Sequence, residues 1–241
     1  MKTKLFFAIL WFSIQNAFSW TWPEVSIRSM YGSQFLDPGT GYVIYDKPVV
    51  QSDLEIGIPF GFRVNVLNSK SLNGGWGETL GDEMDYTLGW RGAIIKNFGL
   101  DVSVTFLDEL HLFQMGEDDI FYSRFHLSYT HNEWRFSGIW ENYTTFSSGH
   151  LTGGDLVGLG VEREFALVGE WLILEAETAT LYNAGALHRE GFFQRGMINL
   201  GWEISKGLTI IAPRVDFYVP FENHHHKRND AVVFMGLKYR F

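Results

Sequence analysis

The chain ends in the run Ala231-Val232-Val233-Phe234-Met235-Gly236-Leu237-Lys238-Tyr239-Arg240-Phe241. Apolar side chains occupy every second position up to the final aromatic ring, and Gly236, Lys238 and Arg240 lie between them. Successive side chains of a β-strand point to opposite faces, so this alternation predicts a strand with one apolar and one polar face. That apolar face must be buried against protein or against lipid.

The same alternation recurs along most of the chain. Strands with one apolar, aromatic-rich face are predicted at 52–66, 84–96, 118–129, 192–204 and 207–219, with weaker ones near 24–33 and 41–47. Several are longer than the ~5–6 residues of an ordinary globular strand. A tilted strand needs ~9–11 residues to cross the hydrocarbon layer of a membrane. The strand lengths therefore favour a membrane-spanning sheet.

Connection lengths distinguish a barrel from a soluble secreted β-sandwich, which also alternates. Tight turns are predicted at Asn97-Phe98, Thr130–Asn132, Arg163–Leu167 and Ser205-Lys206, and long polar connections at Leu67–Glu83, Asp108–Glu117, Tyr143–Gly153, Asn183–Gly191 and Pro220–Asn229. Short periplasmic turns and long extracellular loops alternate in this way in outer-membrane proteins. We therefore predict an all-β fold, a transmembrane antiparallel up-and-down β-barrel of about twelve strands, with ten as the lower bound.

Two prolines conflict with this prediction. Pro59 and Pro213 fall inside predicted strands, where each removes a ladder hydrogen bond. A closed barrel has no edge strand on which to place them, so we expect a local bulge at each.

The N-terminus predicts export. Lys2 and Lys4 precede the apolar run 5–14, which is too short to cross a bilayer as a helix, and small residues follow at Ala17 and Ser19. We expect a signal peptide over 1–19 and an outer-membrane β-barrel over 20–241. No later segment approaches the ~20 apolar residues of a transmembrane helix.

Composition excludes several kinds of function. The chain contains no cysteine, which excludes disulfides, thiolate metal sites and cysteine nucleophiles. The formal net charge is -9, and loss of Lys2 and Lys4 with the leader makes it -11. A nucleic-acid partner is unsuited to so acidic a protein, because phosphates require a basic surface. No cofactor is predicted.

The polar faces of the strands would line the barrel interior. The candidate pore-lining residues are Arg63, Asp85, Arg91, Arg124, Arg135, Glu141, Glu175, Glu177, Arg195, Glu203, Arg214, Asp216 and Lys238, and the same face would carry Arg28, Arg240, Asp53, Glu55, Asp101 and Glu162. The two signs nearly balance. They predict a narrow lumen filled by ion pairs and water, or a pore whose charges select the solutes that pass.

Aromatic residues would form girdles where the apolar band meets the headgroups. The candidates are Trp90, Trp134, Trp140, Phe192, Trp202, Tyr239 and Phe241. Phe192 and Trp202 lie ten positions apart on one strand face, which is roughly 33 Å along the strand. With a tilt of ~40° this projects to roughly 25 Å, the height of the apolar band of such barrels.

Other polar clusters suggest weaker functional hypotheses. His126 and Ser128 have the spacing of a base and nucleophile on one strand face, with Glu141 placed to orient the imidazole, as in a barrel lipid hydrolase. His224, His225 and His226 could bind a transition metal, although a loop gives them no fixed geometry, and no metal site is predicted. Trp76, in a Gly-rich loop, could contact a ligand or lipopolysaccharide.

Two segments carry a family resemblance. Residues 81–90 (Gly-Asp-Glu-Met-Asp-Tyr-Thr-Leu-Gly-Trp), followed by 99–104 (Gly-Leu-Asp-Val-Ser-Val), resemble the small TorF-type porins. This resemblance implies a small β-barrel, and no catalytic residues carry over from the family to this chain. A final strand closed by Phe241 further resembles outer-membrane proteins, whose assembly machinery reads that end.

We therefore expect a passive channel for small solutes in the bacterial outer membrane, in contact with lipid and lipopolysaccharide. The alternatives are a structural or adhesive barrel with a closed lumen and partner-binding loops, and a hydrolase that uses His126 and Ser128.

Overall fold

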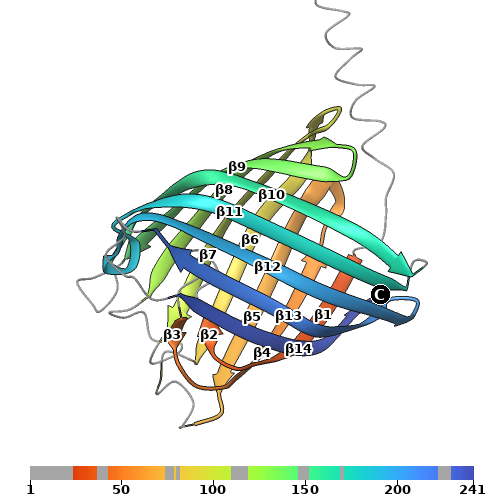
Figure 1. The fold of residues 1–241 in the computed structure, drawn as a ribbon, viewed down its shortest axis with the longest axis horizontal. Coiled ribbons are helices and arrows are strands. Elements are labelled where there is room, and N and C mark those ends of the chain that lie inside the picture. Colours follow the sequence, from red (N-terminus) through yellow and green to blue (C-terminus); the bar gives the residue numbers. More distant parts are fainter. Residues whose placement is uncertain are drawn as a thin grey trace, which may run out of the picture.

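The computed structural model describes residues 24–36, 43–73, 79, 82–109, 119–145, 152–168, 171–221 and 229–241. These residues form a closed barrel of 12 antiparallel strands, as the sequence predicts (Figure 1). Its strands are β1 (Glu24–Gly32), β4 (Val49–Gly57), β5 (Phe62–Ser71), β6 (Glu83–Ile95), β7 (Phe98–Glu109), β8 (Ile120–His131), β9 (Trp134–Thr145), β10 (Gly154–Val168), β11 (Leu172–Ala184), β12 (Glu190–Ser205), β13 (Leu208–Pro220) and β14 (Asp230–Arg240).

Each barrel strand pairs with its neighbours in chain order, and β1 closes the barrel on β14. In that closure Ser26 lies opposite Arg240 and Gly32 lies opposite Phe234. Strands β2 (Phe35–Leu36) and β3 (Val43–Tyr45) form a separate two-stranded sheet between β1 and β4. The predicted up-and-down topology is confirmed.

The predicted number of barrel strands is correct, but two of the predicted strands are wrong. The segment 52–66 is a hairpin rather than one strand, because β4 ends at Gly57 and β5 begins at Phe62. The segment near 41–47 contributes only the short β3, which lies outside the barrel sheet. The predicted turn at Arg163–Leu167 is also wrong, since these residues continue β10 to Val168.

The two prolines behave differently. Around Pro213 the register of β13 with β14 shifts between Ile211 and Arg214, which is the predicted bulge. Pro59 instead begins a 3-10 turn over Pro59–Gly61 that joins β4 to β5. Phe60 and Gly61 have φ values of 72° and 86° in this turn. A proline that fixes its own φ is well suited to open such a turn, and it needs no ladder partner there.

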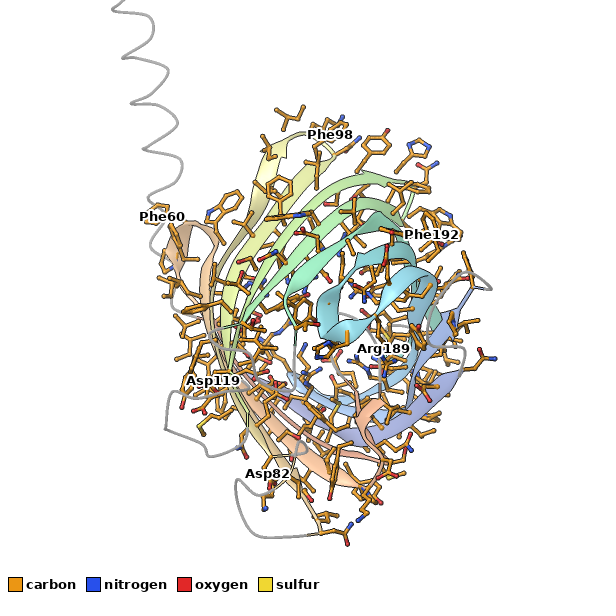
Figure 2. All side chains as sticks on the ribbon, turned by 90° about the vertical axis from the view of Figure 1, so that its left-hand side faces the viewer. Phe60, Asp82, Phe98, Asp119, Arg189 and Phe192 are labelled. Carbon is orange, nitrogen blue, oxygen red and sulfur yellow. The ribbon has the colours of Figure 1, made fainter. Side chains whose placement is uncertain are left out.

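The two ends of the barrel differ. The short-turn end carries the turns Pro59–Gly61, 96–97, 132–133 and 206–207, and Phe241 lies there with its backbone N–H bonded to the Val25 carbonyl. The long-loop end carries the longer connections, the β2–β3 sheet and a 3-10 turn, η2 (Ala186–His188). Figure 2 views the barrel from the long-loop end.

The outer face of the barrel is apolar. On β14 the residues Val233, Met235, Leu237 and Tyr239 are exposed, as is Phe241 directly after it, whereas Val232 and Phe234 are buried inside. In Figure 2 Phe98 and Phe192 point away from the lumen, while Arg189 lies within the outline of the mouth. Among the described residues, none of the helical segments has the length and apolar character to cross a membrane. Large apolar side chains exposed on this scale are typical of a surface that contacts a membrane or another protein.

Candidate pore

A buried carboxylate forms the centre of the lumen network. Glu141, on β9, is 0% exposed and accepts two hydrogen bonds from the Arg195 guanidinium, at 2.8 and 3.0 Å. It also accepts a hydrogen bond from Nε2 of His126 at 2.8 Å. The other ring nitrogen of His126 faces Nη2 of Arg124 at 3.1 Å. The register between β8 and β9 places Arg124 opposite Glu141 and therefore keeps these groups together.

Further ion pairs line the wall around this centre. Asp101, on β7, accepts hydrogen bonds of 2.7 Å from both Arg63 and Arg91. Arg214 and Asp216, two positions apart on β13, form a double hydrogen bond of 2.8 Å at each contact. Additional pairs are Arg28–Asp53 and Arg135–Glu162. Each joins inward-facing residues of opposite charge, so much of the lumen charge is neutralised locally.

Two adjoining cavities occupy the interior. One, of about 580 Å³, lies toward the short-turn end and is lined by Arg91, Asn97, Asp101 and Thr130 among others. The second, of about 270 Å³, is lined by residues that include Arg28, Gln51, Arg195 and Arg214. Arg124 and Glu177 line both cavities. They therefore mark the junction between the two spaces.

Apolar side chains fill another part of the interior. They form a buried cluster of Leu107, Ile120, Tyr122, Ile139, Tyr143, Leu156, Ala179, Leu181, Ala186, Phe193 and Tyr218, against which Leu187 packs. Ala186 and Leu187 belong to η2, so the cluster reaches the long-loop end. The alternation of the strands predicted a polar inner face throughout and did not predict this cluster. Its signal was present, since Leu156, Leu181 and Phe193 interrupt the polar phase of their strands.

Most predicted pore residues do lie against the two cavities. Those in the lining are Asp85, Arg91, Arg124, Arg135, Glu141, Glu175, Glu177, Arg195, Arg214 and Asp216. Arg63 lies beside the larger cavity, where it donates a hydrogen bond to the lining residue Asp101. Lys238 lies opposite Arg28, a lining residue of the smaller cavity, in the register of β14 with β1. Glu203 is exposed near the short-turn end of β12 and lines neither cavity. The role of these residues in permeation stays a prediction.

The predicted girdle residues lie at both ends of the outer face. Trp134, Trp202, Tyr239 and Phe241 are exposed at the short-turn end, and Phe192 is exposed at the long-loop end. Trp90, at the short-turn end, is partly covered because its Nε1 donates to the Phe60 carbonyl at 2.7 Å.

Trp140 lies nearer the long-loop end, and its Nε1 donates to Asp155 at 3.2 Å. The rings of Tyr86, Phe106 and Phe121 lie next to one another in that order near the same end, and they were not among the predicted girdle residues.

The geometry gives no support to the hydrolase hypothesis. Glu141 does bind His126, as that hypothesis required. Both ring nitrogens of His126 are engaged, however, and Ser128 donates its hydroxyl to the Gly99 carbonyl at 3.3 Å. Among the described residues nothing joins Ser128 to His126 by a hydrogen bond. Both side chains line the larger cavity rather than the apolar outer face.

Several sequence predictions fall outside the described residues. They are the signal peptide at 1–19, Trp76, and the histidines at 224–226. Within the described part of the chain, no group of three or more His, Cys, Asp or Glu residues is placed to hold a metal ion.

Comparisons with known proteins identify the fold. No protein-family profile matches the chain, and no curated protein sequence matches it. A solved KdgM porin is similar, with a TM-score of 0.58, 9% identity and coverage of 90% of this chain and 99% of that one. The KdgM porin in complex with disordered oligogalacturonate gives a TM-score of 0.55, 8% identity and coverage of 90% and 99%.

A NanC porin is also similar, with a TM-score of 0.56, 9% identity and coverage of 89% of this chain and 98% of that one. At these identities the likeness concerns the fold, which is the fold of an outer-membrane porin. The resemblance to TorF-type porins stays a prediction.

Proposed function

We propose that this protein is a passive, porin-like channel for small solutes in the outer membrane. The observation that supports this most strongly is the pair of adjoining, charge-lined cavities inside a closed barrel with an apolar outer face. Charged side chains are costly to enclose unless they are paired or hydrated. A lumen that encloses so many of them is suited to water and polar solutes.

The lumen charges favour small polar solutes over a long polyanion. One structural neighbour is described in complex with oligogalacturonate, an acidic sugar chain. In the present lumen Arg195, Arg63 and Arg91 are each engaged by a carboxylate of the chain itself, and so are Arg28 and Arg214. An acidic chain would have to displace these carboxylates. We therefore propose small solutes and a weak preference between cations and anions.

The outer surface suggests where the barrel resides. We propose that its apolar belt contacts lipid and lipopolysaccharide, with the short-turn end toward the periplasm. The assembly machinery would read β14 and Phe241. These proposals rest on the exposed aromatic side chains and on the placement of Phe241 at the short-turn end.

Electrical recording tests the channel. We expect the refolded mature protein to give discrete single-channel steps in planar bilayers, with a cation-to-anion permeability ratio near one. Ser137 lines the larger cavity, so Ser137→Trp should lower the conductance to about half or less by filling part of this space. Ser205→Trp, at the exposed end of β12, is the matched control and should leave the conductance unchanged.

A structural or adhesive barrel is the second candidate function. The buried apolar cluster that reaches η2 favours it, because packed side chains leave no path for solutes. A folded barrel that stays silent in bilayers, in both the parent and the Ser137→Trp variant, would support this function and exclude the channel.

A further inference from the structure

Like charges face one another across two strands of the lumen wall. In the register of β10 with β11, Glu162 lies directly opposite Glu177, and Glu164 lies opposite Glu175. Directly opposed like charges destabilise an antiparallel pair. Arg135 neutralises Glu162, and Asn199 donates a hydrogen bond to Glu175 at 3.2 Å. The wall formed by these four glutamates, here called the acidic wall, therefore keeps excess negative charge.

Glu177 is the member of the acidic wall at the junction of the two cavities. Its carboxylate forms no hydrogen bond or ion pair with any residue that the structure describes. It is half-buried, so solvent reaches it. Arg195 and Arg214 lie close enough to interact with it electrostatically, but each is hydrogen-bonded to another carboxylate. The Glu177 oxygens are therefore available to a ligand.

Arg124 is the cationic counterpart at the same junction. Its guanidinium contacts the His126 ring, and among the described residues it forms no hydrogen bond with a carboxylate. Asp101 and Glu141 lie close enough to interact with it electrostatically, but each is hydrogen-bonded to other arginines.

Arg124 comes from β8 and Glu177 from β11, with β9 and β10 between them. Three steps of ~4.8 Å separate the two backbones by roughly 14 Å across the strands. In the register Arg124 is level with Asn183 of β11, six residues from Glu177, which adds an offset of roughly 20 Å along the strand direction. The side chains extend into the space between, leaving room for a small solute.

We propose that this junction is a binding site for small zwitterions, in which Arg124 binds the carboxylate and Glu177 binds the ammonium group of an amino acid. This inference rests on the proposed channel function and names the solute class. Guanidinium and carboxylate recognise each other through charge-assisted hydrogen bonds, and Arg can form two such bonds at once. The ammonium group would bind Glu177 in the acidic wall, whose negative charge is not fully neutralised by the neighbouring arginine side chains.

A zwitterion is favoured over a simple ion for an electrostatic reason. A free anion at Arg124 would lie near the acidic wall, and a free cation at Glu177 would lie near Arg124, Arg195 and Arg214. Each would be repelled by the group of its own sign. A solute that carries both charges at the right separation satisfies both groups.

The experiment measures binding to the complete mature barrel, refolded in detergent, by titration calorimetry at low salt. The probes are glycine, 4-aminobutyrate and 6-aminohexanoate, which differ in charge separation, with butyrate and butylamine as singly charged controls. We expect one ω-amino acid to bind about tenfold or more tightly than either control. Added salt should weaken that preference.

Two variants locate the site. Glu177→Gln and Arg124→Gln should each weaken binding of the preferred probe about tenfold, whereas Arg124→Lys, which keeps the charge but loses the two-pronged hydrogen bonding, should fall between Arg124→Gln and the parent. Glu203→Gln and Lys206→Gln, both exposed at the short-turn end of β12, are the matched controls and should change nothing. The unboiled gel position verifies that each variant is folded.

The outcomes separate the site from the channel. The zwitterion site would be overturned, even if the barrel conducts, by equal binding of all probes or by tightest binding of butyrate or butylamine. Full binding of the preferred probe by Glu177→Gln and Arg124→Gln would overturn it too. Selective binding without any single-channel activity would uphold the site and remove the channel function.

Discussion

Replacing Glu141 by Gln will lower the free energy of unfolding of the barrel by about 3–5 kcal/mol. Glu141 is completely buried and is the carboxylate that Arg195 contacts through both of its terminal nitrogens. The variant keeps the shape of the side chain but leaves the Arg195 charge without a partner. In the parent chain Glu141 accepts hydrogen bonds from Nε2 of His126 and from both terminal nitrogens of Arg195. The amide of Gln has one oxygen acceptor and an NH₂ donor, so it can accept from only some of these three donors. Urea unfolding of the barrel in lipid vesicles measures the loss.

The control is a more exposed pair in the same lumen. Arg135 is 54% exposed and pairs with Glu162 at 2.9 Å. Because exposed ion pairs contribute only about 0–1 kcal/mol, Glu162→Gln should cost far less than Glu141→Gln. The double variant Glu141→Leu with Arg195→Met removes both charges and should recover most of the stability. A cost below about 1 kcal/mol for Glu141→Gln would contradict the assigned burial.

Replacing Leu159 by Arg will destabilise the membrane-inserted barrel by about 2–4 kcal/mol. Leu159 is 73% exposed on the outer face of β10, which would make this change almost neutral in a water-soluble protein. If that face contacts lipid, the guanidinium must be placed in hydrocarbon or must draw water to it. Unfolding in vesicles, compared with the parent chain, measures the cost.

The control for Leu159→Arg lies on the same strand. Val168 is also exposed, at the short-turn end of β10. An arginine there would lie near the headgroups, so Val168→Arg should cost only about 0–1 kcal/mol. Equal effects of the two substitutions would argue against a depth-dependent environment and therefore against a membrane around the barrel.

Periodicity predicted the fold because each strand meets two different environments. The alternation in β14 and β12 fixed which side chains face out, and the structure places Met235 and Trp202 outside as expected. The connection lengths predicted the antiparallel order. The segment 52–66 was wrongly predicted as one strand because its alternation fits either a continuous strand or a hairpin with a tight turn. Pro59 with Phe60 and Gly61 continues the apolar alternation of 52–66, yet it forms a turn that ends one strand and begins another.

The candidate pore was predictable only in part. The alternation along each strand predicts that Arg124, Glu177 and Glu141 face the lumen. Their partners depend on register and on barrel curvature, which bring Arg195 of β12 to Glu141 of β9 across two intervening strands. Periodicity carries no information about such contacts. The apolar cluster was missed because apolar residues on both faces remove the alternation itself.

The most direct measurement of the central claim follows the mature chain, urea-unfolded and diluted into lipid vesicles, on gels with and without boiling. We expect that the protein inserts, that the unboiled sample migrates apart from the boiled one, and that the vesicles protect the barrel strands from protease. Identical migration, together with a folded protein that stays in plain buffer and leaves the vesicles untouched, would show that the apolar outer face does not contact lipid.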